Sequence, residues 1–196
     1  MDQSFLERKD RIILSTIDLM NEFGTQSVST KKIALREGIT EAAIFKHFPK
    51  KNDLLLAVLE YFSKYDNDIY ESVKLGSMNP FEAITFYVDM YSSYYQSYPA
   101  VTVILHSFNE FKYNKKLTQK VQDIIEMRKN FFKEYIIKAQ ENNEISTELN
   151  SDILVDVFIG SLNEICFRWR MSDYSFSLKE KCSLAVNILL NEFKIK

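Results

Sequence analysis

Glycine and proline are scarce in this sequence, and their scarcity limits the possible folds more than any other feature. Four Gly and three Pro occur in 196 residues, roughly a third of ordinary usage. Sheets need tight turns, and tight turns depend on residues that tolerate a positive φ or fix it. A chain of this length also lies near the upper limit of what one hydrophobic core covers. The sequence therefore predicts an all-α protein, folded as one compact unit or two small lobes.

The few Gly and Pro residues mark expected helix boundaries. Six of the seven fall where the helical spacing of apolar residues is interrupted, and only Gly160 lies inside an apolar helical segment. We expect about nine helices, over residues 5–23, 30–37, 40–48, 50–74, 81–97, 100–111, 117–142, 151–171 and 178–193.

The distribution of charge separates the start of the chain from the rest. A net charge of −2 argues against a uniformly basic nucleic-acid-binding protein, although a local basic surface is compatible with it. Residues 1–51 carry nine basic and seven acidic side chains, whereas the remainder carries sixteen and twenty. We therefore expect a mildly basic N-terminal region and an acidic C-terminal region with different tasks.

Neither targeting nor membrane insertion is indicated by the hydropathy pattern. The first residues mix charges without an apolar core, and the longest apolar run, 54–59, has six residues. Cys166 and Cys182 form no CxxC pair, which favours two buried free thiols over a metal or redox site. We therefore expect a cytoplasmic protein with no metal, no cofactor and no membrane partner.

Catalytic motifs are also missing from the sequence. Neither His47 nor His106 has Glu three residues before it, as a helical di-iron site would require. The sequence has no HExxH motif, no Gly-rich phosphate loop and no spacing typical of a Ser/His/Asp triad. We therefore do not expect an enzyme, and a helical enzyme stays the least favoured alternative.

Residues 29–48 have the dimensions of a helix-turn-helix, with Gly38 in the turn. Ser29 and Thr40 occupy expected helix N-termini, where free amides and the helix dipole favour a phosphate. Lysines flank the same surface and attract phosphate electrostatically: Lys31, Lys46, Lys50 and Lys51. An ordinary helical hairpin would have similar spacing, so the pattern alone leaves both interpretations open.

The segment SVSTKKIALREGITEAAIFKHFPKKNDLLLAV resembles the N-terminal DNA-binding domain of the TetR/AcrR family of transcriptional regulators. The matching residues are Ser29, Ile33, Ala34, Gly38, Ile39, Thr40, Phe45, Lys46, His47, Phe48, Lys51, Asp53, Leu54 and Leu55. The resemblance implies a helix-turn-helix DNA-binding domain over 1–50. It also implies a helical effector-binding and dimerisation domain over 51–196.

By matching positions, the resemblance implies a recognition helix over 40–47. The expected DNA-binding residues are Ser29, Thr30, Lys31, Thr40, Ala42, Ala43, Phe45, Lys46, His47 and Lys51. Where the family usually has Gly, a hydroxyl residue and Tyr, this chain has Ala42, Ala43 and Phe45. The two alanines offer apolar contact, for instance to a thymine methyl, but no hydrogen bond to a base.

Aromatic residues concentrate after residue 60, where all eleven Tyr lie. Five of them occupy a single helical face, at positions 87, 91, 94, 95 and 98. A dry core would favour Phe or Leu, because each phenol requires a hydrogen-bonding partner. The tyrosine face is therefore either plain core or one wall of a cavity for a lipophilic effector. The residues expected to line such a cavity are Phe62, Tyr65, Tyr87, Tyr91, Tyr94, Tyr95, Phe108, Phe111 and Phe132.

The helix expected over 151–171 is apolar on nearly every side, so two surfaces must cover it. The simplest second cover is another copy of the chain, with Gly160 and Ser161 allowing helices to approach closely. We therefore predict a homodimer built as a four-helix bundle, with interface residues Val157, Phe158, Gly160, Ser161, Ile165, Leu184 and Ile188.

These observations favour a ligand-responsive transcriptional regulator. The expected mechanism is a repressor that a lipophilic small molecule releases from a palindromic operator. A DNA-binding regulator without a small-molecule effector, constitutive or controlled by a protein partner, is the alternative. The helix expected over 50–74 would join the DNA and effector sites.

Overall fold

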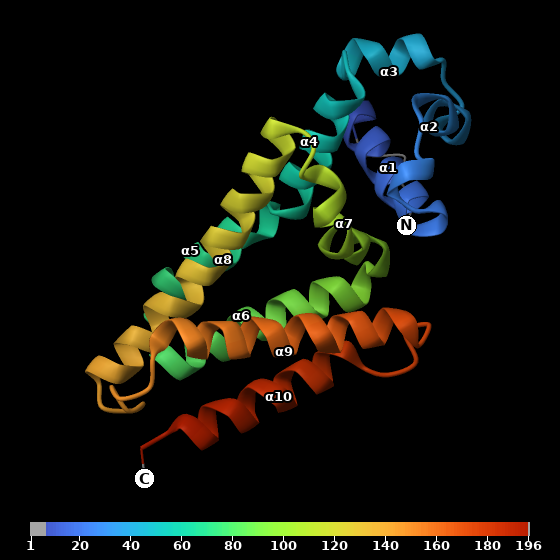
Figure 1. Ribbon diagram of the computed structural model, residues 1–196. Helices are drawn as coiled ribbons and strands as arrows, with labels where there is room; N and C mark the ends of the chain where they lie inside the picture. Colours follow the sequence, from blue (N-terminus) through green and yellow to red (C-terminus); the bar gives the residue numbers. More distant parts are fainter. Residues whose placement is uncertain (1–6, 196) are drawn as a thin grey trace. The chain divides into compact units, whose positions relative to one another are not determined.

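A computed structural model describes residues 7–195 and confirms the all-α prediction (Figure 1). The described chain contains ten α-helices and two short 3-10 helices. The α-helices are α1 (Arg8–Phe23), α2 (Thr30–Glu37), α3 (Glu41–His47), α4 (Lys51–Phe62), α5 (Lys64–Leu75), α6 (Pro80–Ser97), α7 (Val103–Phe111), α8 (Lys115–Glu141), α9 (Ser151–Met171) and α10 (Leu178–Phe193). The 3-10 helices are η1 (Thr25–Ser27) and η2 (Pro99–Thr102). The predicted start of the first helix at Phe5 lies outside the described residues.

The helices form two compact units. The first contains the chain as far as Lys64 together with Ala100–Asp123, and the second contains Tyr65–Pro99 and Ile124–Lys196. Helix α7, far along the sequence, therefore belongs to the same unit as α1 to α4, and α8 contributes residues to both units.

In the first unit, α1 packs against α2, α4 and α7. Its inward face carries Ile12, Ile17 and Met20, all fully buried. A hydrogen bond of 2.7 Å between the buried hydroxyls of Thr25 and Ser107 joins η1 to α7. The Ser107 hydroxyl donates to the Val103 carbonyl at 2.9 Å and accepts from Thr25, so both hydroxyl protons have an acceptor and this polar pair fits into the core.

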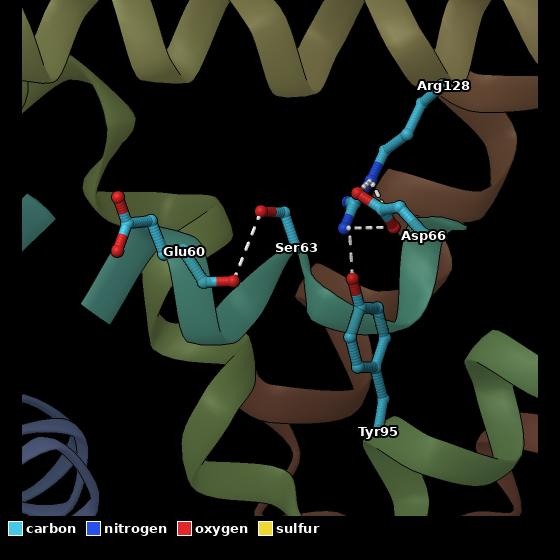
Figure 2. Close-up of polar contacts among 5 residues, drawn as sticks. All are labelled: Glu60, Ser63, Asp66, Tyr95 and Arg128. Carbon is cyan, nitrogen blue, oxygen red and sulfur yellow. Dashed lines mark hydrogen bonds and ion pairs between the residues drawn. The ribbon is translucent and has the colours of Figure 1, made fainter. Parts of the chain in front are cut away.

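The helix predicted over 50–74 is interrupted at Ser63. Helix α4 ends at Phe62 and α5 begins at Lys64, with Ser63 between them at φ −90° and ψ 2°. The Ser63 hydroxyl donates to the carbonyl of Glu60 at 3.3 Å (Figure 2). Serine hydroxyls that bond their own helix backbone compete with regular helical geometry. Because no Gly or Pro marks this break, sequence spacing could not locate it.

In the second unit, α10 packs against both α6 and α9 (Figure 1). The ring of Phe132 on α8 stacks on that of Phe158 on α9, with centroids 5.9 Å apart. Trp169 on α9 is buried, and its indole nitrogen donates to the carbonyl of Phe176 at 2.9 Å. These large side chains form the core that positions the tyrosines of α6.

Cys166 and Cys182 are free and buried in the second unit, as predicted. Among the described residues, no group of His, Cys, Asp or Glu side chains is arranged to hold a metal ion. No helix in the described part of the chain has both the length and the apolar character needed to cross a bilayer.

Candidate DNA-binding surface and effector-binding core

Helices α2 and α3 form the predicted helix-turn-helix. Gly38 ends α2 in the left-handed region, at φ 64° and ψ 32°. The next amide, that of Ile39, donates back to the carbonyl of Ala34 at 3.0 Å. This tight reversal depends on a residue without a Cβ, because the left-handed conformation is costly for other residues.

Two hydroxyl side chains cap these helices, as predicted. The Ser29 hydroxyl accepts from the Lys32 amide at 3.3 Å, and the Thr40 hydroxyl accepts from the Ala43 amide at 3.2 Å. An accepting hydroxyl keeps its own proton. Each cap can therefore still donate to a DNA phosphate. The Thr30 hydroxyl instead donates to Glu41 Oε2 at 2.6 Å, which ties α2 to α3 and gives this predicted DNA contact a partner within the protein.

The exposed face of α3 carries four of the ten side chains predicted to meet DNA. Ala42, Lys46 and His47 are exposed, and Phe45 is 45% exposed. Ala43 is half-buried. An exposed Phe beside Lys on a helix of seven residues gives this face both apolar and cationic contacts.

Lys51 has a structural contact that the sequence did not indicate. Its Nζ donates to the carbonyl of Val28 at 2.7 Å, which links the start of α4 to the residue before Ser29. An ammonium group has three donors, so a phosphate contact is still compatible with this bond. Replacing Lys51 would nevertheless disturb the domain as well as its charge.

Ion pairs missed by sequence reasoning hold α2 against α1. Arg36 donates two hydrogen bonds to the carboxylate of Glu22, at 2.9 and 2.5 Å. These bonds to Arg36 lower the pKa of Glu22. Ser15 and Arg11 on α1 both contact Glu37. The partners are too far apart in sequence to show any helical spacing, so no local signal identified them.

The residues predicted to line an effector cavity are divided between the two units. Phe62, Phe108 and Phe111 belong to the first unit, where Phe62 and Phe108 lie edge to face at 6.1 Å between centroids. The tyrosines and Phe132 belong to the second. There Tyr87 lies 5.1 Å from Phe132, and Tyr65 lies 4.4 Å from Tyr94, between ring centroids.

An ion pair lies beside the tyrosines inside the second unit (Figure 2). Arg128 Nε and Nη2 contact the two carboxylate oxygens of Asp66, each at 3.2 Å. Arg128 Nη1 donates to the hydroxyl of Tyr95 at 3.3 Å. The guanidinium carbon lies 4.7 Å from the ring centroid of Tyr91, a cation–π distance. Sequence reasoning missed this pair, although Asp66 shares the helical face of buried Ile69 and Val73 and could have been noticed.

Two hydroxyls of the tyrosine face have no hydrogen-bond partner among the described residues: those of Tyr87 and Tyr91. Both side chains are buried. Burial raises the pKa of Tyr87 far above its ordinary value, so its hydroxyl stays protonated and can donate. A buried hydroxyl without a partner loses its hydration without compensation. A plain apolar core would not explain why these positions carry phenols.

The second unit also has an open surface groove of about 570 Å³ between α6 and α10. It contains none of the residues predicted to bind the effector. Its lining is mixed, with Phe81, Phe86 and Leu190 beside Glu82 and Asp89.

The surface of α9 and α10 corrects part of the predicted dimer interface. Phe158 is 0% exposed and Ile165 7% exposed within their own subunit, so Phe158 offers a second copy no surface and Ile165 offers little. Val157 is 39% exposed, Leu184 60% and Ile188 53%. Gly160 is exposed, Ser161 is half-buried, and an added Cβ at Gly160 would meet nothing within 4 Å. Ile153 and Met171 are also exposed on α9 and were not predicted.

Two family profiles match the chain. Residues 12–58 match the family of bacterial regulatory proteins described as the tetR family, and residues 61–192 match the C-terminal region of YsiA-like proteins. The chain belongs to the TetR family. This TetR-family protein is therefore a DNA-binding transcriptional regulator and not an enzyme, and the resemblance found in the sequence is confirmed.

Individual known proteins match this chain at low sequence identity, one by sequence and two solved structures by fold. The chain is 20% identical to the nucleoid occlusion factor SlmA of Aliivibrio fischeri, over 88% of this chain and 89% of that one. FadR of Bacillus subtilis, solved in complex with stearoyl-CoA, has a TM-score of 0.80 and 19% identity over 92% of this chain and 97% of that one. The ketosteroid regulator KstR2 of Mycobacterium tuberculosis has a TM-score of 0.82 and 15% identity over 97% of each chain.

Proposed function

We propose that this regulator is a homodimeric repressor that releases a palindromic operator when a lipophilic molecule binds its helical body. The observation that carries the proposal is the buried tyrosine face of α6, where two phenols lack partners among the described residues. The likeness in fold to the FadR structure with stearoyl-CoA supports a long-chain acyl-CoA as the effector to test first.

The DNA contacts in this proposal come from α3 and the two helix caps. Ala42, Phe45, Lys46 and His47 would face the major groove and its phosphates, while Ser29 and Thr40 would donate to phosphates at helix N-termini. Lys31 is exposed and would add phosphate attraction. The half-buried Ala43 would contribute at the edge of this surface.

The dimer in this proposal uses the exposed apolar side chains of α9 and α10. Leu184, Ile188 and Val157 would pack against the same residues of a second copy in an isologous four-helix bundle. Such a dimer would present two recognition helices roughly 34–36 Å apart, about one turn of DNA. The operator would then consist of two inverted half-sites.

Release of DNA follows if the effector prefers a conformer with a different spacing of the recognition helices. The coupling needed is about 1–3 kcal/mol, which corresponds to roughly a 5- to 150-fold change in operator affinity. Only a difference in effector affinity between the two conformers can supply this coupling.

The test begins with the operator. Fragments that the purified protein selects from its own genomic DNA would be sequenced, and binding would be followed by fluorescence anisotropy with and without stearoyl-CoA. We expect inverted repeats among the selected fragments and weaker binding with stearoyl-CoA. Free coenzyme A, which has no acyl chain, serves as the control and should leave binding unchanged.

The alternative is a DNA-binding regulator without a small-molecule effector. The 20% identity to a protein named as a nucleoid occlusion factor, a name that mentions no small molecule, supports this alternative. DNA binding that persists unchanged with every lipophilic probe would support this alternative and contradict the effector part of our proposal.

A further inference from the structure

We propose that Tyr87 and Tyr91 donate hydrogen bonds to a neutral carbonyl oxygen of the effector. This inference rests on the proposed function and adds the chemical group that the protein recognises. The ligand class is an apolar molecule that carries an ester, thioester or ketone, as opposed to a free carboxylic acid.

The positions of the two phenols carry the inference. Tyr87 and Tyr91 are one turn apart on α6, with ring centroids separated by 4.7 Å. Tyr87 is 5% exposed and Tyr91 is 7% exposed, and neither hydroxyl has a hydrogen-bond partner among the described residues. Burying a hydroxyl without a partner costs its hydration, and phenylalanine would fill nearly the same volume without that cost. The hydroxyls are therefore best explained by an acceptor that arrives with a ligand.

The neighbours of Tyr87 indicate that the rest of this ligand is apolar. Its ring stacks on Phe131 at 4.3 Å and meets the edge of Phe132 at 5.1 Å between centroids. Both Phe side chains are buried. A ligand whose polar atom reaches the phenols would thus lie against hydrocarbon.

A continuous series of aromatic rings connects Tyr91 and Tyr87 to the surface of the second unit. Tyr65 is 40% exposed and lies 4.4 Å from Tyr94. Tyr94 lies 5.9 Å from Tyr95, which lies 5.5 Å from Tyr91. Displacement of these rings would open a path along α6 from Tyr65 to the unpartnered hydroxyls.

The charges beside the phenols select a neutral acceptor. Arg128 lies over the ring of Tyr91, but the Asp66 carboxylate contacts the same guanidinium at 3.2 Å. The pair has no net charge, so it cannot offset the cost of burying a carboxylate. A carbonyl oxygen needs only the two hydroxyl donors.

The test compares Tyr87→Phe and Tyr91→Phe with Tyr113→Phe, a control at a side chain that is 84% exposed. Binding of methyl stearate, stearoyl-CoA and 4-cholesten-3-one would be followed by the fluorescence of Trp169, the single tryptophan. We expect each core variant to bind the preferred carbonyl probe about tenfold more weakly, as for one lost hydrogen bond. Tyr113→Phe should bind like the wild type. The probe that binds best distinguishes an acyl ester or thioester from a cyclic ketone.

Two further measurements test the inference independently. Without ligand, Tyr87→Phe and Tyr91→Phe should have a Tm equal to or above that of the wild type, because each removes a buried hydroxyl without a partner. Stearate should bind the wild type more weakly than methyl stearate.

The outcomes separate this inference from the proposed function. Equal carbonyl binding by wild type and core variants, a lowered Tm without ligand, or stearate binding as tight as that of methyl stearate would each overturn the inference alone. Failure of the wild type to bind any of these probes would instead contradict the lipophilic effector itself, and the inference with it.

Discussion

Arg128 on α8 and Asp66 on α5 form a bidentate ion pair inside the second unit, in which Nε lies 3.2 Å from Oδ2 and Nη2 lies 3.2 Å from Oδ1. The side chain of Asp66 is 2% exposed and that of Arg128 is 15% exposed. Since neither charge has ready access to water, each depends on the other for compensation. This pair therefore differs in kind from the exposed ion pairs elsewhere on the helices.

Replacing Asp66 with Asn should lower the free energy of unfolding by about 3–5 kcal/mol, because the variant removes the carboxylate that faces the buried charge of Arg128. Urea denaturation followed by circular dichroism measures the change. The control is Asp152→Asn, which removes an exposed partner of Lys133 and should have a much smaller effect. Similar losses in both variants would contradict a special role for the buried pair.

Lys46→Ala should weaken DNA binding and reduce the slope of log affinity against log salt by about one, as expected for one lost phosphate contact. The measurement is anisotropy titration of a genome-selected fragment at several salt concentrations. Lys51 is unsuited to this test, because its Nζ also bonds the Val28 carbonyl. Lys74→Ala, at an exposed lysine of α5, is the charge-matched control. An unchanged salt slope for Lys46→Ala would argue against its place on the DNA surface.

Glutamate at both Leu184 and Ile188 should convert the proposed dimer to a monomer, because it places two charges at the centre of an apolar contact. Sizing with light scattering at micromolar concentration gives the mass directly. Leu75→Glu changes a leucine on α5 that is 85% exposed, more than either interface residue, and should leave the mass unchanged. A wild-type protein that is already monomeric would exclude this interface.

Gly160→Ala distinguishes a role within the subunit from a role between subunits. Within the subunit, an added Cβ meets nothing within 4 Å, so Ala should stabilise the helix by about 1 kcal/mol. If a partner helix approaches closely at this position, dimer affinity should nevertheless fall. Sedimentation over a concentration series measures that affinity. An unchanged dimerisation constant would place Gly160 outside the contact.

The two thiols should be unreactive in the folded protein. Burial raises the pKa of Cys166 to about 11 and that of Cys182 to about 12. At about pH 8, Ellman's reagent should therefore modify both slowly until urea unfolds the chain. Because the thiols ionise more readily when unfolded, their contribution to stability is complete at neutral pH and is lost as pH rises above about 9. Rapid modification of the native protein would contradict this burial.

Local signals in the sequence were sufficient for the helix-turn-helix. Ser29, Gly38 and Thr40 act through their own backbone neighbours, so their caps and the left-handed turn could be predicted without knowing the rest of the fold. The burial of Phe158 and Ile165 could not be predicted from the sequence, because an apolar side chain suits a core and an interface equally well.

By itself, the sequence determined the all-α class, the cap positions, the family and the helical face shared by the tyrosines, since each depends on composition or on spacing along one helix. Only the tertiary structure decided which tyrosine hydroxyls have hydrogen-bond partners and which charged side chains form ion pairs. Asp66 and Arg128 are 62 positions apart in the chain, and Lys51 reaches Val28 across 23. Such contacts follow from how separate helices pack, and no local pattern encodes that packing.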